Sequence, residues 1–383
     1  MKLSSDTALV YIITHMELGG AQKVCLSLCS GFKSHQLHTY LITGRQGILA
    51  DQINGPFKTI FLDSLKREVG IKALLQEIKT FFSLIKMLRT LRKQHKKVIV
   101  HTHCTKAGIL GRWAAWIAGI KVRIHTIHGY AFHDHQSRIK WLLHYLPELL
   151  TSFITTHFVC VSAADAKTGI ALFPRFSRKH SIIRAAIAWE QFYIPARKPE
   201  SDSPSEHFIF GSISCFKEQK NLFDLLSAFK MVHDACPVAR LEIIGDGILR
   251  PALQTWIKEH NVSDYVTLHG WQNNVVPFML NWKAFVLSSL WEGLPCAVVE
   301  ARMLKLPVLA YNTGGINEVI TPGANGFLYP QKEWKQLAQG MITLIQSPQL
   351  HQKLQSYSDN LADFNDHSMI QSHHKLYKRL NHH

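Results

Sequence analysis

The 383-residue sequence has no apolar run long enough to cross a lipid bilayer. A spanning helix needs about 20 consecutive apolar residues, and the run Leu9–Ile13 near the start is much shorter. That run is also too short for the core of a signal peptide, and no small-residue cleavage site follows it. We therefore interpret it as part of a first β-strand.

Cysteines are few and carry no recognisable pattern. There are seven, an odd number, and only Cys25 and Cys29 lie at the i,i+4 spacing of a helix. This scatter excludes a disulfide framework and lacks the paired spacing of a zinc site. The sequence predicts reduced thiols, as in a cytosolic protein.

Two further patterns are missing from the second half. No Asp-x-Asp pair follows an expected strand there, and the turn Gly245-Asp246-Gly247 lacks the third glycine of a dinucleotide fingerprint. A nicotinamide site is therefore excluded at this turn. The sequence predicts a protein without a metal or another cofactor.

Acidic residues are scarce in the first half. Residues 1–195 hold 26 lysines and arginines against 10 aspartates and glutamates, a net charge of +16. Residues 196–383 hold 17 of each, a net charge of zero. This asymmetry indicates two units with different partners. An anionic membrane, a nucleic acid or a phosphorylated substrate would each suit the basic unit.

Short β-rich runs alternate with helical patterns along the chain, which is typical of parallel sheets covered on both faces. In the first half we expect strands at 8–14, 39–43, 59–62, 98–101, 123–126 and 158–161, and helices at 21–32, 71–94, 106–118 and 139–151. In the second half we expect strands at 208–213, 241–244, 266–268, 284–287, 307–310 and 326–329. The sequence thus predicts two doubly wound α/β domains.

The polar segment 195–205 contains three prolines and is predicted to be a surface linker. It separates an N-terminal domain, 1–195, from a C-terminal domain, 206–364. A helix near 365–383 is expected to pack back on the first domain.

Ligands of open α/β sheets bind beyond the carboxyl ends of the strands. Gly19 and Gly20 follow the first strand and precede a helix, a position suited to phosphate. Lys220 lies at a loop–helix junction, where its ammonium group would neutralise a diphosphate. Glu292 lies on a glycine-containing loop, and Glu300 lies in the helix after it. That spacing allows one carboxylate to reach a reacting sugar and the other a ribose hydroxyl.

The run Glu292-Gly-Leu-Pro-Cys-Ala-Val-Val-Glu300 resembles the signature of glycosyltransferase family 4, whose members are retaining enzymes of the two-domain GT-B fold. The similarity covers nearly the whole chain. It includes Gly19-Gly20-Ala21, His101–Gly108, His125–Gly129, Lys220-Asn221, Gly245-Asp246-Gly247, His269-Gly270-Trp271, Gly314-Gly315-Ile316-Asn317-Glu318 and Gly323-Ala324-Asn325-Gly326.

The resemblance implies two domains facing across a cleft, with the acceptor in the first and the nucleotide-sugar in the second. It implies that Lys220 stabilises the leaving diphosphate, that Glu292 faces the transferred sugar, and that Glu300 accepts hydrogen bonds from the ribose.

The resemblance also implies roles for several neighbours of these residues. His128 would lie beside the sugar, although a histidine at a strand end is also readily explained as structural, as are His101 and His103. The remaining residues implied to bind the nucleotide-sugar are Gly19, Gly20, Gly245, Gly247, Gly293 and Leu294.

One position departs from the family pattern. Members commonly carry an arginine shortly before the lysine that binds the diphosphate, and Cys215 stands there in this chain. Lys217 or Arg184 would have to supply the missing charge. Without such a replacement, stabilisation of the leaving group would be weaker.

The helix expected at 71–94 combines two patterns. Its apolar residues recur at helical spacing, as in a stripe that faces a core; they are Ile71, Leu75, Ile78, Phe82, Ile85 and Leu88. Its lysines Lys72, Lys79, Lys86 and Lys93 form one line. A solvated face explains this line, and an anionic membrane explains the line and the charge excess together. Apart from the adjacent Phe81 and Phe82, no aromatic residues are interleaved with the lysines, which argues against nucleic acid.

These expectations combine into a retaining enzyme that moves a hexose or N-acetylhexosamine from a nucleotide-sugar, most favourably a UDP-sugar, to a saccharide or lipid-linked saccharide. Its pathway would be cell-surface polysaccharide or lipopolysaccharide synthesis, and its location the inner face of the cytoplasmic membrane. Two alternatives stay open. One is a nucleotide-sugar 2-epimerase of the same fold, and the other is an inactive membrane-binding relative.

Overall fold

The computed structural model describes residues 6–32, 37–66, 71–192 and 207–381, and leaves the side chains of 71–74 aside. The chain forms two compact units. The first contains Met1–Ile187 and Asp363–His383, and the second contains Ala188–Ala362. The first boundary precedes the expected one at residue 195, because the short helix α6 (Trp189–Phe192) groups with the second unit. The expected linker at 195–205 lies outside the described residues.

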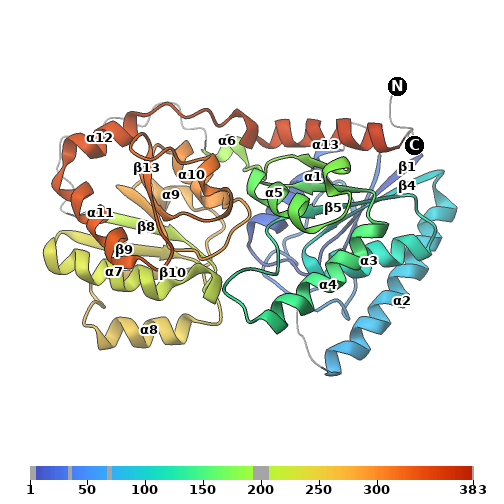
Figure 1. The fold of residues 1–383 in the computed structure, drawn as a ribbon, viewed down its shortest axis with the longest axis horizontal. Helices are drawn as coiled ribbons and strands as arrows, with labels where there is room; N and C mark the ends of the chain where they lie inside the picture. Colours follow the sequence, from blue (N-terminus) through green and yellow to red (C-terminus); the bar gives the residue numbers. More distant parts are fainter. Residues whose placement is uncertain (1–5, 33–36, 67–70, 193–206, 382–383) are drawn as a thin grey trace. The chain divides into compact units, whose positions relative to one another are not determined.

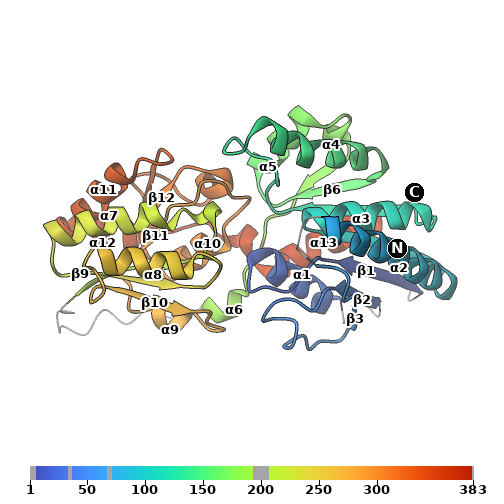
Figure 2. The same cartoon turned by 90° about the horizontal axis from the view of Figure 1, so that it is seen from below.

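The first unit is built on a seven-stranded, fully parallel sheet of order β3-β2-β1-β4-β5-β6-β7 (Figures 1 and 2). Its strands are β1 (Thr7–Ile12), β2 (His38–Thr43), β3 (Lys58–Phe61), β4 (Lys97–His103), β5 (Val122–Ile127), β6 (His157–Cys160) and β7 (His180–Ile182). The order runs outward in both directions from β1 and β4, so the loops after these two strands flank the point where it reverses.

Helices cover both faces of this sheet. They are α1 (Gly20–Gly31), α2 (Ile71–Gln94), α3 (Thr105–Ile117), α4 (Arg138–Ile154), α5 (Ala163–Leu172) and α13 (Asp366–Leu380). Successive side chains of a strand point to opposite faces. Val10 and its alternate neighbours on β1 join a core with Leu88 of α2 and Ala114 of α3, whereas Tyr11 faces Tyr377 of α13.

The C-terminal helix α13 therefore completes the core of the first unit. The hydroxyl groups of Tyr377 and Tyr11 lie 3.1 Å apart, and the Tyr377 hydroxyl lies 2.6 Å from Nδ1 of His101. All three side chains are buried. A polar contact this deep in the core fixes the position of the helix along the sheet, because each group would be costly to leave unpaired.

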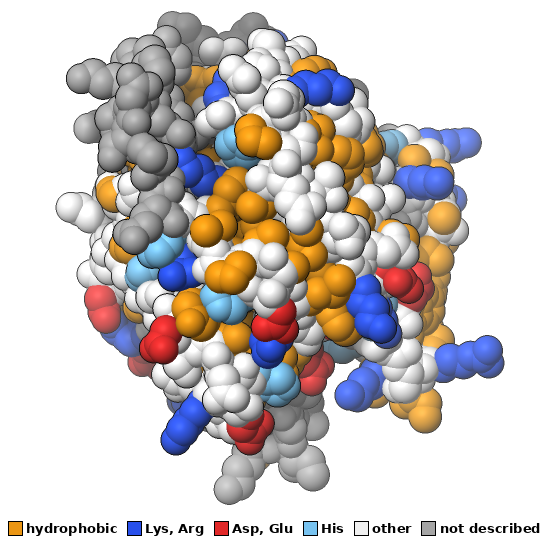
Figure 3. All heavy atoms as spheres, turned by 90° about the vertical axis from the view of Figure 1, so that its left-hand side faces the viewer, with side chains coloured by type: hydrophobic (Ala, Val, Ile, Leu, Met, Phe, Trp, Pro, Cys, Tyr) orange, Lys and Arg blue, Asp and Glu red, His pale blue; other side chains and the backbone are white. Residues whose placement is uncertain are grey.

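The second unit repeats the architecture with a six-stranded parallel sheet of order β10-β9-β8-β11-β12-β13. Its strands are β8 (Phe208–Ile213), β9 (Ala239–Ile244), β10 (Val266–Gly270), β11 (Ala284–Leu287), β12 (Val308–Tyr311) and β13 (Gly326–Tyr329). Besides α6, its helices are α7 (Leu222–Ala235), α8 (Arg250–Glu259), α9 (Val276–Met279), α10 (Cys296–Met303), α11 (Trp334–Gln346) and α12 (Pro348–Ser356). Figure 3 views the side of this unit that faces left in Figure 1, where acidic and basic side chains are interspersed.

Two doubly wound parallel-sheet units were predicted from the sequence, and this fold class is confirmed. The helix α5 and the three-residue strand β7 were not predicted. Among the helices whose residues the structure describes, none has the length and apolarity needed to cross a membrane.

The prediction for α2 is wrong in its first half. Ile85 and Leu88 are buried as expected, but Leu75, Ile78 and Phe82 are exposed. These three side chains lie on the outer side of the helix, whereas Thr80 in the same turns is fully buried and donates a hydrogen bond to the Ser64 hydroxyl (2.7 Å). The side chain of Lys72 lies outside the described part, and Lys79, Lys86 and Lys93 are exposed.

Candidate functional site

The candidate site in the second unit lies where the strand order reverses. Strands β8 and β11 are neighbours, and the chain continues outward from them in opposite directions. Crevices outside the carboxyl ends of such strands are the usual binding sites of open α/β sheets. The loop after β8 leads to Lys220, and the loop after β11 leads to Glu292.

These two loops are joined by hydrogen bonds. The Leu290 amide donates to the Gln219 carbonyl (2.8 Å), and the Gln219 side chain donates to the Trp291 carbonyl (2.7 Å). The Ser288 hydroxyl donates to the carbonyl of Lys220 (2.9 Å). Asn221 ends the first loop with φ of 45°, a left-handed conformation that asparagine tolerates. The loops therefore form one preorganised wall.

Lys220 and Glu292, the two residues predicted to act on the nucleotide-sugar, form an ion pair between Nζ and Oε1. They are 72 positions apart in sequence, and their side chains are only 17% and 8% exposed. An ion pair with so little solvent is screened far less than a surface pair. Each charge therefore holds the other in position beyond the carboxyl ends of β8 and β11.

Glu300 is buried on α10, directly after the Glu292 loop. A buried ion pair between Arg302 and Asp359 (2.8 Å) holds this helix, and the Asn325 side chain donates to the same carboxylate (2.6 Å). No side chain caps the N-terminus of α10, whose residue before the first turn is Pro295. Uncapped amides at a helix start suit an anionic ligand.

The glycine pair Gly314-Gly315 packs closely against the backbone of the Glu292 loop. Gly314 has φ of 53°, and a Cβ atom there would lie 2.0 Å from the carbonyl oxygen of Glu292. The Gly315 amide donates to the Gly293 carbonyl (2.7 Å). Only glycine permits this close approach. Gly293 and Leu294, which were predicted to bind the ligand, are both buried in the loop that these glycines support.

Gly245 and Gly247 lie in the loop after β9 and also pack against backbone. Their φ angles are 131° and 156°, and added Cβ atoms would lie 1.9 Å from the Ser214 carbonyl oxygen and 2.7 Å from that of Phe216. Packing against the β8 loop explains why these residues are glycines. Their contact with a nucleotide-sugar remains a prediction.

Cys215 lies in the same β8 loop as Lys220, and its side chain is part-exposed. Lys217 lies two residues further and starts the turn that ends at Lys220. Arg250, which sequence reasoning missed, places its guanidinium 5.3 Å from the Phe216 ring centroid and pairs with Asp246 (2.8 Å). Two basic residues of the second unit therefore flank the position where the family arginine is missing.

In the first unit, Gly19 and Gly20 follow β1, at the reversal point between β1 and β4. Gly19 is the extended residue before α1, and no side chain caps this helix. The Ala107 amide of α3 donates to the Thr14 hydroxyl (3.2 Å), which joins the loops after β1 and β4. A contact of Gly19 and Gly20 with phosphates remains a prediction.

His128 follows β5 and lies 2.9 Å, between Nε2 and Nδ1, from the ring of His103 at the end of β4. Burial, and secondarily the charge of His373, lowers the pKa of His128 to about 3. Burial likewise lowers the pKa of His103. Both rings are therefore neutral at pH 7, and one nitrogen donates to the other. Sequence reasoning left His103 as structural, and the structure gives it a direct contact with the predicted catalytic histidine.

These two rings belong to a larger buried cluster that includes His101, His125 and His373. The rings of His101 and His103 stack with centroids 4.7 Å apart, and those of His101 and His373 are 5.6 Å apart. Within the described residues, no group of histidine, cysteine, aspartate or glutamate side chains is arranged to hold a metal ion. The cluster is a hydrogen-bonded core of neutral rings that fixes the loops after β4 and β5.

The structure thus brings the predicted residues together in two groups. Lys220, Glu292, Gly293, Leu294 and Glu300 gather at the β8–β11 end of the second unit. Gly19, Gly20 and His128 lie on loops after neighbouring β1, β4 and β5 of the first unit. Each group is built by residues far apart in sequence, at the position that the fold class favours for a ligand.

Comparison with known families matches both units. Residues 194–361 match the family described as "Glycosyl transferases group 1", and residues 18–184 match "Glycosyltransferase Family 4". The UDP-Gal:alpha-D-GlcNAc-diphosphoundecaprenol alpha-1,3-galactosyltransferase of Escherichia coli is 30% identical over 328 residues, covering 82% of this chain and 83% of that protein. The capsular polysaccharide biosynthesis glycosyltransferase CapM of Staphylococcus aureus is 25% identical over 320 residues, covering 76% of each chain.

Solved structures share the fold at lower identity. Anabaena Alr3699/HepE in complex with UDP-glucose has a TM-score of 0.77 and 16% identity, covering 97% of this chain and 99% of that one. Sucrose-phosphate synthase from Thermosynechococcus elongatus has a TM-score of 0.79 and 17% identity, covering 98% and 99%. These similarities show that the chain shares the two-domain fold of these structures over 97% or more of its length.

Proposed function

This chain belongs to the group 1 glycosyltransferases of GT-B fold, and we propose that it transfers a hexose or N-acetylhexosamine from a UDP-sugar, with retention, to a saccharide or lipid-linked saccharide. One observation carries the proposal: an ion pair of Lys220 and Glu292 joins the loops after β8 and β11, and buried Glu300 lies on the helix that follows the second loop. A cation for the diphosphate and two carboxylates for hydroxyl groups are what a nucleotide-sugar requires. UDP is favoured because it is the nucleotide named for the Escherichia coli relative and for Alr3699/HepE.

The ion pair has a direct consequence for the chemistry. A diphosphate entering the crevice competes with Glu292 for Lys220, and the compact ammonium group then stabilises the negative charge that develops on the leaving group. Lys217 and Arg250 supply further positive charge where Cys215 replaces the usual arginine. No metal is needed in this arrangement.

Glu292, once released from Lys220, faces the transferred sugar, while Glu300 accepts hydrogen bonds from the ribose hydroxyls. The amides at the start of α10 and the backbone of Gly293 and Leu294 approach the nucleotide-sugar from the same wall. Retention is proposed from the family resemblance: the nucleotide departs and the acceptor attacks on the same face of the sugar.

The first unit is proposed to bind the acceptor, with His128 beside the sugar and Gly19 and Gly20 nearest the phosphates. The acceptor class follows the printed names of the relatives, which act on diphosphoundecaprenol-linked N-acetylglucosamine or in capsular polysaccharide synthesis. Cell-surface polysaccharide or lipopolysaccharide synthesis at the inner face of the membrane is the proposed setting. The excess positive charge of the first unit would hold the protein at an anionic leaflet. Nucleic acid is not a proposed partner.

The test is a screen of UDP-, GDP- and ADP-hexoses in the presence of EDTA, with and without a polyprenyl-diphosphate-linked N-acetylglucosamine acceptor. We expect consumption of one UDP-sugar, release of UDP, and a product whose anomeric configuration, read by NMR, matches that of the substrate. An epimer formed without acceptor would instead identify a 2-epimerase. No consumption of any nucleotide-sugar would support the inactive alternative, and loss of turnover with EDTA would overturn the metal-free mechanism.

A further inference from the structure

Helix α4 of the first unit presents large apolar side chains to solvent. They are Ile139, Leu142, Leu143, Leu146, Leu150 and Phe153, and we call them the apolar face of α4. Ile139, Leu143 and Phe153 are 73%, 66% and 63% exposed. The spacing of three and four residues places all six along one side of the helix. Isolated exposed leucines are common on proteins, but a continuous stripe of this kind marks an interaction site.

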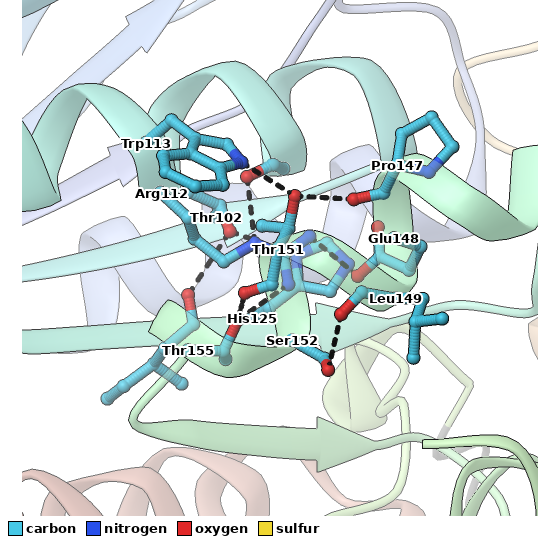
Figure 4. Close-up of polar contacts among 12 residues, drawn as sticks. Thr102, Arg112, Trp113, His125, Pro147, Glu148, Leu149, Thr151, Ser152 and Thr155 are labelled. Carbon is cyan, nitrogen blue, oxygen red and sulfur yellow. Dashed lines mark hydrogen bonds and ion pairs between the residues drawn. The ribbon is translucent and has the colours of Figure 1, made fainter. Parts of the chain in front are cut away.

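On its inner side, α4 packs Trp141, Tyr145 and Leu149 against a buried aromatic cluster, and its second half also carries buried polar side chains. Figure 4 shows Glu148, Thr151 and Thr155 directed toward α3. The Glu148 carboxylate pairs with buried Arg112 (2.7 Å), and the Thr155 hydroxyl accepts from the same guanidinium (2.9 Å). The Thr151 hydroxyl accepts from the Trp113 indole (2.9 Å).

A surface helix usually exposes a polar or charged side, whereas α4 is apolar on its outer side as well. The inner face of α4 is fixed by directed hydrogen bonds and a buried ion pair, so the helix cannot rotate to hide its leucines without breaking them. The outward direction of the apolar face is therefore built into the fold. A face of this kind is stable when it lies in apolar surroundings.

Adjacent helices of the same layer continue the surface. Trp116 and Ile117 at the end of α3 are exposed, and the Trp116 ring lies 5.6 Å, between centroids, from Trp113. On the far side of α3, the exposed first turns of α2 carry Leu75, Ile78 and Phe82. Lys79 and Lys86 flank Phe82 on the same side of α2. Apolar and aromatic side chains interleaved with lysines are typical of helices that lie in a membrane interface.

Charge selects the partner of this surface. Residues 71–154 hold 14 lysines and arginines against the three acids Glu77, Asp134 and Glu148. Glu77 is paired with Lys106 and Glu148 with Arg112, so neither offsets the exposed cations. A second copy of this chain would bring the same positive charge to the contact and would be repelled. An anionic lipid leaflet supplies both the negative charge and the apolar interior.

We propose that the apolar face of α4, continued by Trp116 and the first turns of α2, inserts into the interfacial region of an anionic bilayer. The helix lies in the plane of the membrane, because Glu148, Thr151 and the following Thr155 anchor the second half of its 17 residues to α3. Lysines of α2 contact the headgroups, and the leucines of α4 enter the acyl boundary. This surface deepens the proposed membrane location, and it does not depend on which sugar is transferred.

Insertion and electrostatic attraction are separable by salt. The test measures flotation of the full chain with vesicles of phosphatidylcholine alone or mixed with phosphatidylglycerol, at low salt and at about 1 M salt, where the Debye length is about 3 Å. We expect binding to the anionic vesicles, with a fraction that resists high salt. In the variant Leu143→Ser/Leu146→Ser/Leu150→Ser, the salt-resistant partition coefficient should fall by more than about tenfold, because three inserted side chains lose their apolar burial.

Two controls distinguish the possible causes. The variant Val238→Ser/Tyr357→Ser removes exposed apolar side chains of the second unit and should bind vesicles as the parent does. Calorimetric binding of UDP to the α4 variant in solution should be unchanged, which separates this surface from the site of sugar transfer. Unchanged salt-resistant flotation of the α4 variant would overturn the proposal. Light scattering that shows a dimer for the parent and a monomer for the α4 variant would also overturn it, because a second copy would then cover the apolar face of α4.

Discussion

The two units share one architecture and differ in almost every surface property. The first unit holds 29 lysines and arginines against 11 acids, a net charge of +18, and the second holds 14 against 16, a net charge of −2. Among the described residues, 14 of the 17 exposed large apolar side chains lie in the first unit. The first unit also contains 18 of the 23 histidines.

Under the proposed function, this difference adapts one fold to two kinds of ligand. The second unit has a closed wall of hydrogen-bonded loops around Lys220, Glu292 and Glu300, as a small, highly charged ligand of fixed shape requires. The first unit joins a buried core of neutral histidines to an outer layer that is apolar and basic. Such a surface suits an extended partner better than a small molecule.

The largest effect is expected at Lys220, in the second unit. Lys220→Ala removes the charge that stabilises the departing diphosphate, so kcat/KM for sugar transfer should fall by about 10²–10³. Lys230→Ala is the matched control, because Lys230 lies on α7 of the same unit and pairs only with Asp234 in the contacts seen. A kcat/KM of the Lys220→Ala enzyme within a few-fold of the parent value would show that Lys217 or Arg250 carries this role.

Glu292→Ala should separate turnover from binding. The carboxylate competes with the diphosphate for Lys220, so its removal leaves UDP affinity unchanged or raises it. Turnover should fall by about 10²-fold, because the transferred sugar loses the group that faces it. Parallel measurement of the UDP dissociation constant and kcat tests this split. A loss of affinity as large as the loss of turnover would contradict the assigned role.

Acid should weaken the first unit before the second. Burial lowers the pKa of His157 and His373 to about 4 and that of His128 to about 3. Between the ordinary value of about 6.5 and these values, the unfolded chain binds more protons than the folded one, so stability falls as pH falls. Each such histidine removes about 1.4 kcal/mol per pH unit in that window.

Hydrogen exchange, read by mass spectrometry at pH 7.5 and 5.5 and corrected for intrinsic rates, measures the loss of stability in each unit. Peptides from β4, β5 and α13 should lose protection at the lower pH, and those from β8 and β11 should keep theirs. Replacing His373 with phenylalanine should reduce the pH dependence of the first unit. Equal loss of protection in both units would refute the assigned cause.

The smallest expected effect concerns His103. Its hydrogen bond holds the ring of His128, so His103→Phe should lower kcat by roughly three- to tenfold through misplacement of that ring. UDP affinity should not change, because the nucleotide site lies in the other unit. His103→Asn, which keeps a hydrogen-bonding group at this position, should recover part of the activity. An equal loss in both variants would indicate damage to the core rather than loss of orientation.

The sequence predicted most of the strands and the doubly wound fold class, because alternating β-rich runs and helices in a parallel sheet allow few topologies. It predicted Lys220, Glu292 and Glu300 from loop positions and family resemblance. Their pairing could not be predicted, because 72 residues separate Lys220 from Glu292 and only the strand order brings them together.

The surface of the first unit was harder to predict for a different reason. Helical spacing shows which side chains share a face, but it does not show whether another layer covers that face. Leu75, Ile78 and Phe82 were therefore predicted to be core residues, and the outward direction of the α4 leucines could not be predicted. The contact between His103 and His128 was equally hidden, because their strands β4 and β5 are neighbours only in the folded sheet.

The central claim, that the second unit binds a nucleotide-sugar through the β8–β11 crevice without a metal, is tested most directly by calorimetric titration of UDP in EDTA. The parent protein and the control Glu259→Ala should bind UDP equally. Glu300→Ala should bind it more weakly by about 1.5–3 kcal/mol, because a buried pair of ribose hydroxyls loses its acceptor. Unchanged affinity in Glu300→Ala, or no binding of UDP by the parent in EDTA, would contradict this account.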